Sequence, residues 1–442
     1  MEDNLVYSFN GVNDEIIKVF LPKFEIDMDT MKQIKQMTND KGGMILKNVR
    51  IMPDCHRGHG CCVGLTAQIE DKIYPRYVGV DIGCGISMYP LNIKLKPKKI
   101  PKVEQLIRAM IPMGFDKHKK SQMRDSDWEL LIERSNIDLA NLKEKLSEGQ
   151  LPEKIDREWI DNMMRRVGCD VKNDWKSIGT LGGGNHYVEV NADRDSGSNY
   201  LTVHSGSRNI GFKICCYHQA IIDEGSKFDR IAYVTQIKKI DRKFKDSKVA
   251  KELKDNIKKD MIAGLHPKYL EGQEMLNYLV DMMVGQNIAS LNRIMMIRSV
   301  VEPLLGEEAF DLSLIMETKH NYIDFKRFVL RKGSISAEEG EHCIISLNMR
   351  DGILLCKGKG NPDWNYSSAH GCGRILSRGS ASRLSMKTFE KEMEDVYSTC
   401  VRKETLDESP MAYRDVSLVK SCLKDSVDIL KQLKPVINCK GY

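Results

Sequence analysis

The sequence of 442 residues lacks the metal-binding and nucleotide-binding signatures that are easiest to recognise. Its 13 cysteines form no Cys-x-x-Cys pair, which argues against a zinc finger or zinc ribbon. No Gly-x-x-x-x-Gly-Lys-Ser/Thr loop is present, and Gly58-x-Gly60 is followed by Gly64, one residue too late for a dinucleotide-binding motif. The Lys-x-Asp-Gly motif of ATP-dependent nucleic-acid ligases is also missing, since Met349 stands where the lysine is needed.

The sequence also has no apolar run long enough to span a bilayer, and its start, Met1-Glu2-Asp3-Asn4, lacks the features of a signal peptide. An odd number of scattered cysteines fits reduced thiols better than a disulfide framework. We therefore expect a cytoplasmic protein with no membrane partner. The net charge of +6, with both signs heavily mixed, is only a mild indication of a polyanionic partner.

Glycine-rich segments that carry histidine, cysteine or acidic residues are present from residue 52 to residue 374, and no clean boundary separates them. Strand-like runs at 44–52, 61–69, 86–93, 186–190 and 200–204 alternate with helical patterns at 26–39, 101–168 and 209–299. Short strands dominate 310–380, and helices are predicted at 382–397 and 416–433. We predict an α+β fold with one large mixed domain over 1–442, in which helices surround a strand-rich core with glycine turns and about 101–168 form a helical insertion.

The segment Gly79–Gly85 (Gly-Val-Asp-Ile-Gly-Cys-Gly) places the Asp81 carboxylate and the Cys84 thiol three residues apart. Glycine allows tight backbone conformations that bring two such side chains to one point. A carboxylate is a hard ligand and a thiolate a soft one, so the pair suggests catalytic metal chemistry. A buried structural cysteine in a glycine turn explains this segment, taken alone, about equally well.

The sequence has only ten histidines, but several of them lie in segments with an unusual set of neighbouring residues. Five segments place a histidine close to glycine, asparagine, serine or arginine: Met52–Gly60, Gly182–His186, Val203–Arg208, His320-Asn321 and Ser368–Arg374. A lone histidine is usually a surface or core residue, whereas five such segments indicate a shared site.

In this order, the motifs resemble those of the RtcB-type RNA-splicing ligases: Met-Pro-Asp-x-His-x-Gly-x-Gly, Gly-Val-Asp-Ile-Gly-Cys-Gly, Gly-Gly-Gly-Asn-His, His-Ser-Gly-Ser-Arg and Ala-His-Gly-x-Gly-Arg. The resemblance runs from about residue 50 to Lys440-Gly441. It implies an RtcB-like fold and a GTP- and Mn²⁺-dependent ligase for RNA repair or tRNA splicing. Such enzymes join RNA 3′-phosphate or 2′,3′-cyclic phosphate ends to 5′-hydroxyl ends through a histidine–GMP intermediate.

Carried over residue by residue, the resemblance makes Cys84 a thiolate that bridges two Mn²⁺ ions. Asp81 and His186 would complete the protein ligands of one ion, and His204 and His320 those of the other. Imidazole and carboxylate suit Mn²⁺, but zinc would bind the same groups more tightly. Manganese therefore follows from the resemblance and not from the ligand types.

The resemblance also makes His370 the nucleophile that attacks the α-phosphate of GTP, and Asp54 the carboxylate that orients it. Histidine can act as a covalent nucleophile when it is neutral. An aspartate that accepts a hydrogen bond from one ring nitrogen exposes the lone pair of the other. Capping the RNA 3′-phosphate with GMP then creates a good leaving group, which explains the need for GTP.

For the guanine nucleotide, the resemblance implies polar contacts from Asn185 and Glu189, stacking by Tyr413, and a contact of Lys440 with the guanine edge. Tyr187 stands where the family usually has phenylalanine, and simple core packing explains it about as well.

The glycine loop of the nucleophile adds Gly371 and Gly373 to the nucleotide contacts. The candidates for RNA phosphate contacts are Arg208, Arg374 and Arg378, because forked guanidinium groups suit phosphate. Structural ion pairing is the alternative role for these arginines.

One loop departs from the family pattern. Many members have Pro-Gly-Ser-Met-Gly where this chain reads Ser346–Gly352 (Ser-Leu-Asn-Met-Arg-Asp-Gly), and in the family the serine of that loop approaches the nucleotide. The departure leaves that contact unassigned here and puts the efficiency of guanylylation in question.

Two other functions stay open. A dinuclear-metal phosphodiesterase or nuclease acting on RNA fits the metal ligands but gives no reason for His370 or Lys440. A non-catalytic RNA-binding protein fits the net charge, but only 7% of the residues are aromatic and no stacked-aromatic RNA motif occurs. The sequence leaves open which RNA is joined, the oligomeric state, and whether an activating helper protein takes part.

Overall fold

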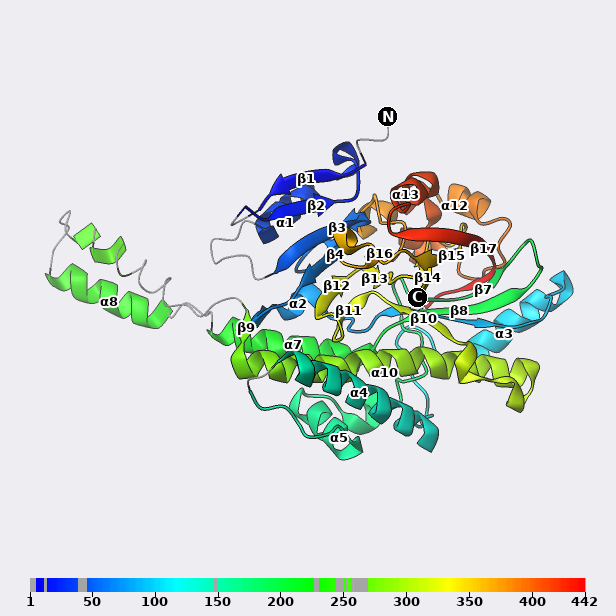
Figure 1. Ribbon diagram of the computed structural model, residues 1–442, viewed down its shortest axis with the longest axis horizontal. Coiled ribbons are helices and arrows are strands. Elements are labelled where there is room, and N and C mark those ends of the chain that lie inside the picture. Colours follow the sequence, from blue (N-terminus) through cyan, green and yellow to red (C-terminus); the bar gives the residue numbers. More distant parts are fainter. Residues whose placement is uncertain are drawn as a thin grey trace.

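The computed structural model describes residues 5–441 except 12–13, 39–45, 147–148, 226–229, 244–249, 252, 256 and 258–268. Two large β-sheets lie against a layer of long helices (Figure 1), which confirms the predicted α+β class. All 13 cysteines are free thiols. In the ranges just given, no helix combines the length and the apolar character needed to cross a membrane.

The seven-stranded sheet contains the strands that carry most of the predicted site. Its order is β10 (Met316–Lys319), β6 (Gly85–Pro90), β8 (Asn199–Ser205), β7 (Tyr187–Ala192), β17 (Val427–Cys439), β15 (Ile353–Gly358) and β14 (His342–Ser346). All of its neighbouring strands are antiparallel. The central strands β6, β8 and β7 are buried along almost their whole length, so their ends are rigid supports.

The six-stranded sheet has the order β1 (Tyr7–Asn10), β2 (Ile16–Val19), β3 (Lys47–His56), β4 (Val63–Gln68), β12 (Val329–Lys332) and β11 (Asn321–Asp324). Only the β2–β3 pair is parallel among these described strands. Two short antiparallel pairs complete the strands: β13 (Ser334–Ser336) with β16 (Ser367–Ala369), and β5 (Lys72–Ile73) with β9 (Leu270–Glu271). The β16 strand leads directly into His370.

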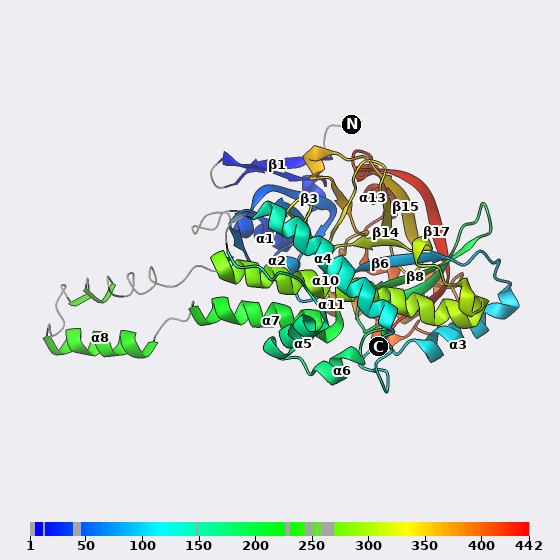
Figure 2. The same ribbon diagram turned by 60° about the horizontal axis from the view of Figure 1, so that its bottom comes forward.

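The helical layer is built on α10 (Gly272–Leu305), which runs below both sheets (Figure 1). Residues 275–301 of this helix are almost all buried, as expected for a helix that is apolar on most sides. The helices α4 (Asp125–Lys145) and α7 (Arg208–Gly225) pack against it, and α4 lies diagonally across it in Figure 2. The largest apolar cluster fills the space between these helices and the six-stranded sheet.

The segment predicted as a helical insertion contains α3 (Ile100–Met110), α4 and α5 (Arg157–Arg166). Pro101 lies in the first turn of α3, where its missing N–H costs no hydrogen bond. The Asp156 side chain caps α5 by accepting from the Trp159 N–H. Because α4 packs on α10, the segment is part of the common helical layer. That it is an insertion stays a prediction.

The other α-helices among the described residues have 4 to 14 residues, and one of them corrects a prediction. They are α1 (Met28–Thr38), α2 (Pro75–Val78), α6 (Val171–Trp175), α8 (Arg230–Lys243), α11 (Arg378–Ala381), α12 (Met386–Glu392) and α13 (Val416–Cys422). The helix predicted at 416–433 is wrong beyond Cys422, because β17 begins at Val427. Its apolar residues fit a helix or a strand, and long-range pairing with β7 and β15 decides for the strand.

Candidate active site

Neighbouring strand ends bring the predicted metal ligands together. Cys84 immediately precedes β6, His186 immediately precedes β7, and His204 lies near the end of β8, which pairs antiparallel with both. His320 follows β10, the other neighbour of β6, and its backbone N–H donates to the Cys84 carbonyl at 2.9 Å. Strand pairing therefore brings four side chains that are far apart in the sequence to the same end of neighbouring strands.

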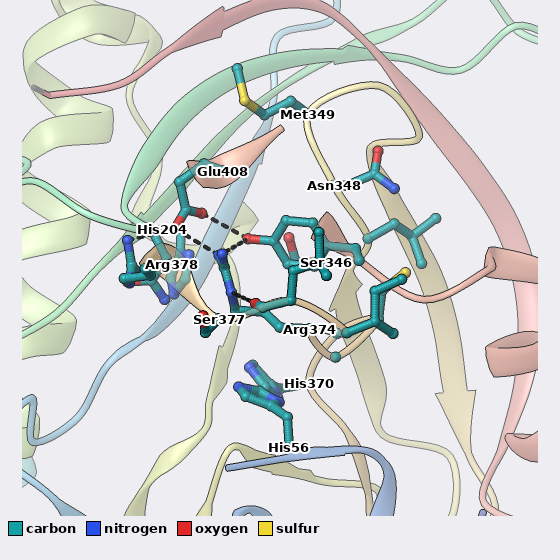
Figure 3. A pocket seen from close by; sticks show the side chains of 18 of the residues that line it. His56, His204, Ser346, Asn348, Met349, His370, Arg374, Ser377, Arg378 and Glu408 are labelled. Carbon is teal, nitrogen blue, oxygen red and sulfur yellow. Dashed lines mark hydrogen bonds and ion pairs between the residues drawn. The ribbon is translucent and has the colours of Figure 1, made fainter. Parts of the chain in front are cut away.

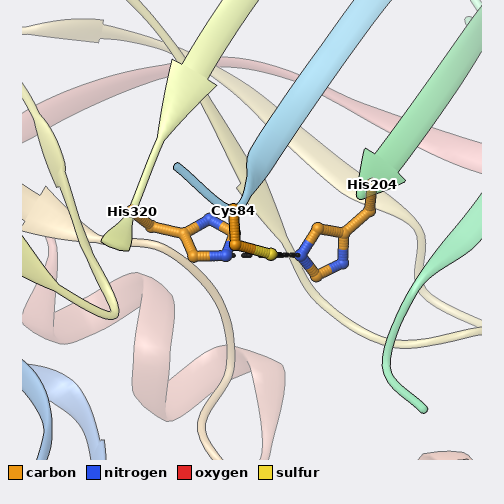
Figure 4. Close-up of side chains that lie close together, drawn as sticks. All are labelled: Cys84, His204 and His320. Atoms are coloured by element: carbon orange, nitrogen blue, oxygen red, sulfur yellow. Dashed lines mark hydrogen bonds between the residues drawn. The ribbon is translucent and has the colours of Figure 1, made fainter. Parts of the chain in front are cut away.

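The ligand atoms form two groups that share one thiol. Cys84 Sγ lies 3.3 Å from His204 Nε2, which is itself 3.3 Å from His320 Nε2 (Figure 4). On the other side, Cys84 Sγ lies 3.5 Å from His186 Nε2, and Asp81 Oδ2 lies 2.9 Å from the same nitrogen. Within each group of three residues, the ligand atoms are within 4.8 Å of one another. This donor set fits two metal ions that share a thiolate.

Burial holds most of this cluster in its uncharged form. It raises the pKa of the Cys84 thiol well above its ordinary value and lowers the pKa of His204 and of His320 well below theirs. Burial also acts to raise the pKa of Asp81, but the adjacent His186 outweighs it and holds that pKa below the usual range. Neutral imidazoles are ready to bind a cation, and the thiol must release its proton when one binds.

Two polar residues of α10 hold the loops of this cluster in place. Arg293 Nη1 donates to the Gly83 carbonyl at 2.8 Å and to the Ser205 carbonyl at 2.7 Å. Asn292 Nδ2 donates to the Gly206 carbonyl at 3.0 Å. Both side chains are completely buried. Neither residue was predicted from the sequence, where an arginine and an asparagine within a mostly apolar helical pattern are the signal that could have found them.

The loop of His370, the predicted nucleophile, is organised around Asp54. Its Oδ2 accepts from the backbone N–H groups of His370 and Gly371, both at 3.1 Å, and lies 2.6 Å from His370 Nδ1. The Gly333 carbonyl oxygen lies 2.8 Å from the same Nδ1, at hydrogen-bond distance, so Nε2 is the ring nitrogen left to react. Gly373 has φ +72°, and a Cβ atom there would lie 2.4 Å from the Asp54 carbonyl oxygen. Only glycine allows this close approach.

A pocket of about 570 Å³ opens beside His370 (Figure 3), a volume in the range of small-molecule sites. The predicted residues that line it are Asn185, Tyr187, Glu189, His204, His370, Gly371, Gly373, Arg374, Arg378, Tyr413 and Lys440. The predicted residues outside its lining are Asp54, Asp81, Cys84, His186, Arg208 and His320. The pocket therefore contacts the predicted nucleophile, His370, and one member, His204, of the group of predicted metal ligands, which we call the metal-ligand cluster: Asp81, Cys84, His186, His204 and His320.

His56 lies beside His370 at the same part of the pocket (Figure 3). Its Nδ1 is 2.9 Å from the Asp54 carbonyl oxygen. Burial lowers the pKa of His56 to about 4, so its ring is neutral at pH 7. His56 belongs to the histidine-bearing segment Met52–Gly60 of the sequence, in which only Asp54 has a predicted role.

Glu408 organises one side of the pocket, which we call the cation wall: Glu408 with Arg374, Arg378, Tyr413 and Lys440. The Tyr413 hydroxyl donates to Glu408 Oε2 at 2.7 Å, and Glu408 pairs with Arg378, Arg374 and Lys440 at 2.8, 3.1 and 3.7 Å. Burial acts to raise the pKa of Glu408, but Lys440 and the arginines hold it below the ordinary value. No sequence motif marks Glu408, so its place in the site was not predicted.

Polar groups at another part of the pocket come from β7. Glu189 accepts from Asn191 Nδ2 at 2.8 Å and from Asn438 Nδ2 at 2.7 Å, and burial raises its pKa to about 7. The Tyr187 hydroxyl lies 2.8 Å from Ser346 Oγ. Although its loop departs from the family pattern, Ser346 also lines the pocket and supplies a hydroxyl there.

Arg208 differs from the other two candidate arginines. Its Nε donates to Thr180 Oγ1 at 3.1 Å and its Nη2 to the Gly114 carbonyl at 3.2 Å. Its φ of +55° is uncommon for a residue with a side chain, and burial lowers its pKa. It therefore lies at the start of α7 and outside the lining of the pocket, whereas Arg374 and Arg378 belong to the cation wall.

Comparison with known proteins gives a consistent family. The family described as tRNA-splicing ligase RtcB matches residues 33–441. The chain is 28% identical to the RNA-splicing ligase RtcB of Escherichia coli K12, covering 96% of this chain and 97% of that protein. It is 25% identical to the tRNA-splicing ligase RtcB of Methanococcus maripaludis, covering 93% and 92% of the two chains. With motifs, fold and a match over nearly its whole length in agreement, the chain belongs to the RtcB family.

Proposed function

We propose that this protein is a GTP- and Mn²⁺-dependent RNA ligase that joins 3′-phosphate or 2′,3′-cyclic phosphate ends to 5′-hydroxyl ends. The observation that carries the proposal is the placement of His370, with Asp54 against its Nδ1, in a nucleotide-sized pocket that also contacts His204. Family membership supports it, since the relatives are named RNA-splicing and tRNA-splicing ligases. The free thiols fit a reducing compartment such as the cytoplasm.

The shared thiol gives each residue of the cluster a role. Asp81, Cys84 and His186 would hold one Mn²⁺ ion, and Cys84, His204 and His320 the other. When bound, the ions supply positive charge that offsets the charge of the phosphates. The hydrogen bonds from α10 keep the ligand loops fixed before any ion binds.

In the first step, His370 Nε2 attacks the α-phosphorus of GTP. A nitrogen–phosphorus bond forms, the bond from that phosphorus to the bridging oxygen breaks, and pyrophosphate leaves. The proton on Nδ1 stays on the ring, and the Asp54 carboxylate 2.6 Å away stabilises the positive charge that develops there.

Side chains in the walls of the pocket would bind the guanine base. An ionised Glu189 accepts from the guanine N–H groups, Lys440 donates to the acceptor edge of the base, and the Tyr413 ring stacks on it. Asn185 and the backbone of Gly371 and Gly373 line the space left for the ribose and phosphates. Charge pairing with Glu408 would hold Lys440 and Tyr413 in position.

In the later steps, an oxygen of the RNA 3′-phosphate attacks the α-phosphorus and releases His370. The 5′-hydroxyl then attacks the RNA phosphorus, loses its proton, and GMP leaves. A cyclic phosphate end is opened by water before guanylylation. Arg208, Arg374 and Arg378 are the candidates to hold the RNA phosphates.

The test is incubation of the protein with α-labelled GTP and Mn²⁺. We expect an acid-labile label on the protein that is absent in His370→Ala and present in the control His342→Ala, which changes an exposed histidine on β14. Label on His370→Ala would contradict the proposal. Conversion of RNA to shorter products without GTP would indicate hydrolysis instead of ligation.

A further inference from the structure

The loop between α3 and α4 presents a phenylalanine completely to solvent. Phe115 has a relative exposure of 103%, the highest among the large apolar side chains in the part of the chain that the structure describes. A single exposed apolar side chain is ordinary by itself, but an exposed aromatic ring can stack on a planar ligand, so the surroundings of Phe115 decide whether it forms part of a site.

The exposure of Phe115 does not come from a loosely attached loop. The Gly114 N–H donates to the Gly182 carbonyl at 2.8 Å, and His118 Nε2 lies 3.0 Å from the Gly179 carbonyl oxygen. These bonds lie on both sides of the phenylalanine and attach the loop to the segment that precedes the metal ligands. The loop on both sides of the ring is therefore held in place before any partner binds, which reduces the entropy lost on binding.

The same loop is continuous with the edge of the pocket. Arg208 Nη2 donates to the Gly114 carbonyl at 3.2 Å, and Gly182 begins the glycine run that leads to Asn185 and His186. Within that run, the position of a Cβ on Gly184 would lie 3.7 Å from Arg378 Nη2. Backbone and arginine side chains thus connect the loop to the cation wall.

The charge around Phe115 indicates the kind of partner. Lys117, Lys119 and Lys120 are exposed within five residues of it, with Asp116 as the acidic residue among them. Lys117 has an ion-pair distance of 3.7 Å to Asp174 but keeps 42% of its side chain exposed. An exposed aromatic ring beside several cations matches the chemistry of unpaired RNA, whose bases stack and whose phosphates attract lysine.

We propose that this loop, residues 111–124, docks an unpaired segment of the RNA substrate next to its reacting end. A base stacks on Phe115, and Lys117, Lys119 and Lys120 with Arg208 contact the phosphates that lead toward the pocket. The inference rests on the proposed RNA ligase function and adds to it a binding surface outside the pocket.

The first test is Phe115→Ala in the full-length protein. We expect the KM for RNA in ligation to rise about tenfold, as for the loss of one stacked base. Phe115→Trp keeps the KM of the unmodified protein, because its ring can stack, whereas Phe115→Leu raises the KM as Phe115→Ala does. Labelling by GTP in the absence of RNA stays unchanged. An unchanged KM for RNA in Phe115→Ala would overturn the docking proposal, whereas absence of GTP labelling in the unmodified protein would overturn the proposed function.

Abasic substrates identify the strand that stacks. One substrate has an abasic nucleotide near the 3′-phosphate end, and the other has it near the 5′-hydroxyl end. If the abasic nucleotide replaces the base that stacks on the ring, the unmodified protein and Phe115→Ala have the same KM for that substrate. An effect of Phe115→Ala that persists with both abasic substrates would overturn stacking.

A matched pair of triple variants tests the lysines. The triple Lys117→Ala, Lys119→Ala and Lys120→Ala weakens RNA binding and lowers the slope of log affinity against log salt by about 0.7 for each phosphate that the lysines had neutralised. The control triple Lys96→Ala, Lys98→Ala and Lys99→Ala removes the same charge from exposed residues at the other end of α3 and leaves binding unchanged. Equal reductions of affinity in both triples would show a general charge effect and overturn a defined docking surface.

Discussion

The metal-ligand cluster and the cation wall border the same pocket, but they differ in the charge of their ionisable side chains. In the cluster, burial pushes Cys84, His204 and His320 toward their neutral forms. In the cation wall, Glu408 and its partners stay charged because they neutralise one another. The cluster is therefore nearly uncharged until its thiol releases a proton to bind a cation, whereas the wall holds paired charges without a ligand.

The largest effect is expected from removal of the shared thiol. Cys84→Ala should abolish binding of both ions and reduce ligation to background, while Asp81→Ala should weaken chiefly one ion. Metal content after Mn²⁺ loading, measured by mass spectrometry, checks both. Cys216→Ala, an exposed cysteine of α7, is the control and should bind both ions. Two tightly bound ions in Cys84→Ala would remove the bridging role.

The next effect concerns the charge balance of the cation wall. Glu408→Gln leaves the buried Lys440 and the partly buried Arg374 without their carboxylate, and the free energy of unfolding should fall by about 3–5 kcal/mol. Asp407→Asn removes a partly exposed partner of Arg378 and should cost about 1 kcal/mol or less. Urea unfolding measures both, and equal decreases would contradict the central place of Glu408. The KM for GTP should rise more in Glu408→Gln.

A smaller effect is expected from Glu189, whose pKa is raised to about 7 by burial. The folded state then holds a proton that the unfolded state releases near pH 4.5, so stability falls as pH rises from about 4.5 to about 7. Glu189→Gln cannot titrate. The difference in unfolding free energy between the two proteins should therefore change by about 3 kcal/mol between pH 4 and pH 8. A constant difference would show that folding does not shift the pKa of Glu189.

The smallest effect is expected at Tyr187, which contacts both regions. The centroid of the Tyr187 ring lies 5.2 Å from the centroid of the His204 ring and 5.7 Å from Lys440 Nζ. Tyr187→Phe keeps these neighbours and removes only the hydroxyl bond to Ser346, so it should cost about 1 kcal/mol of stability. A double-mutant cycle with Ser346→Ala measures the bond, and additive effects would argue against it.

Sequence patterns predicted the part of the site that depends on residue type and order. Glycine-flanked Asp81, Cys84 and the histidines were singled out as one site, and the structure brings them together at the ends of β6, β7 and β8 with His320 after β10. The predicted α+β class is confirmed. These patterns are readable because metal ligands and tight glycine turns require particular residues.

Other features have no local signal. Glu408 looks like any surface acid in the sequence, and Asn292 and Arg293 look like polar positions of a long helix. The strand β17 was mistaken for a helix beyond Cys422 because apolar spacing alone does not separate the two. In each case the deciding contacts join residues far apart in the chain.

The sequence by itself determined the chemistry available to this protein: which side chains can bind a cation, act as a nucleophile or contact a phosphate. The tertiary structure decided how they are combined. Antiparallel pairing of β8 with β6 and β7 made one thiol common to two ligand groups, and folding of the C-terminal chain brought Lys440 to Glu408. Residue type sets what a group can do, but only long-range packing sets its neighbours, its burial and therefore its charge.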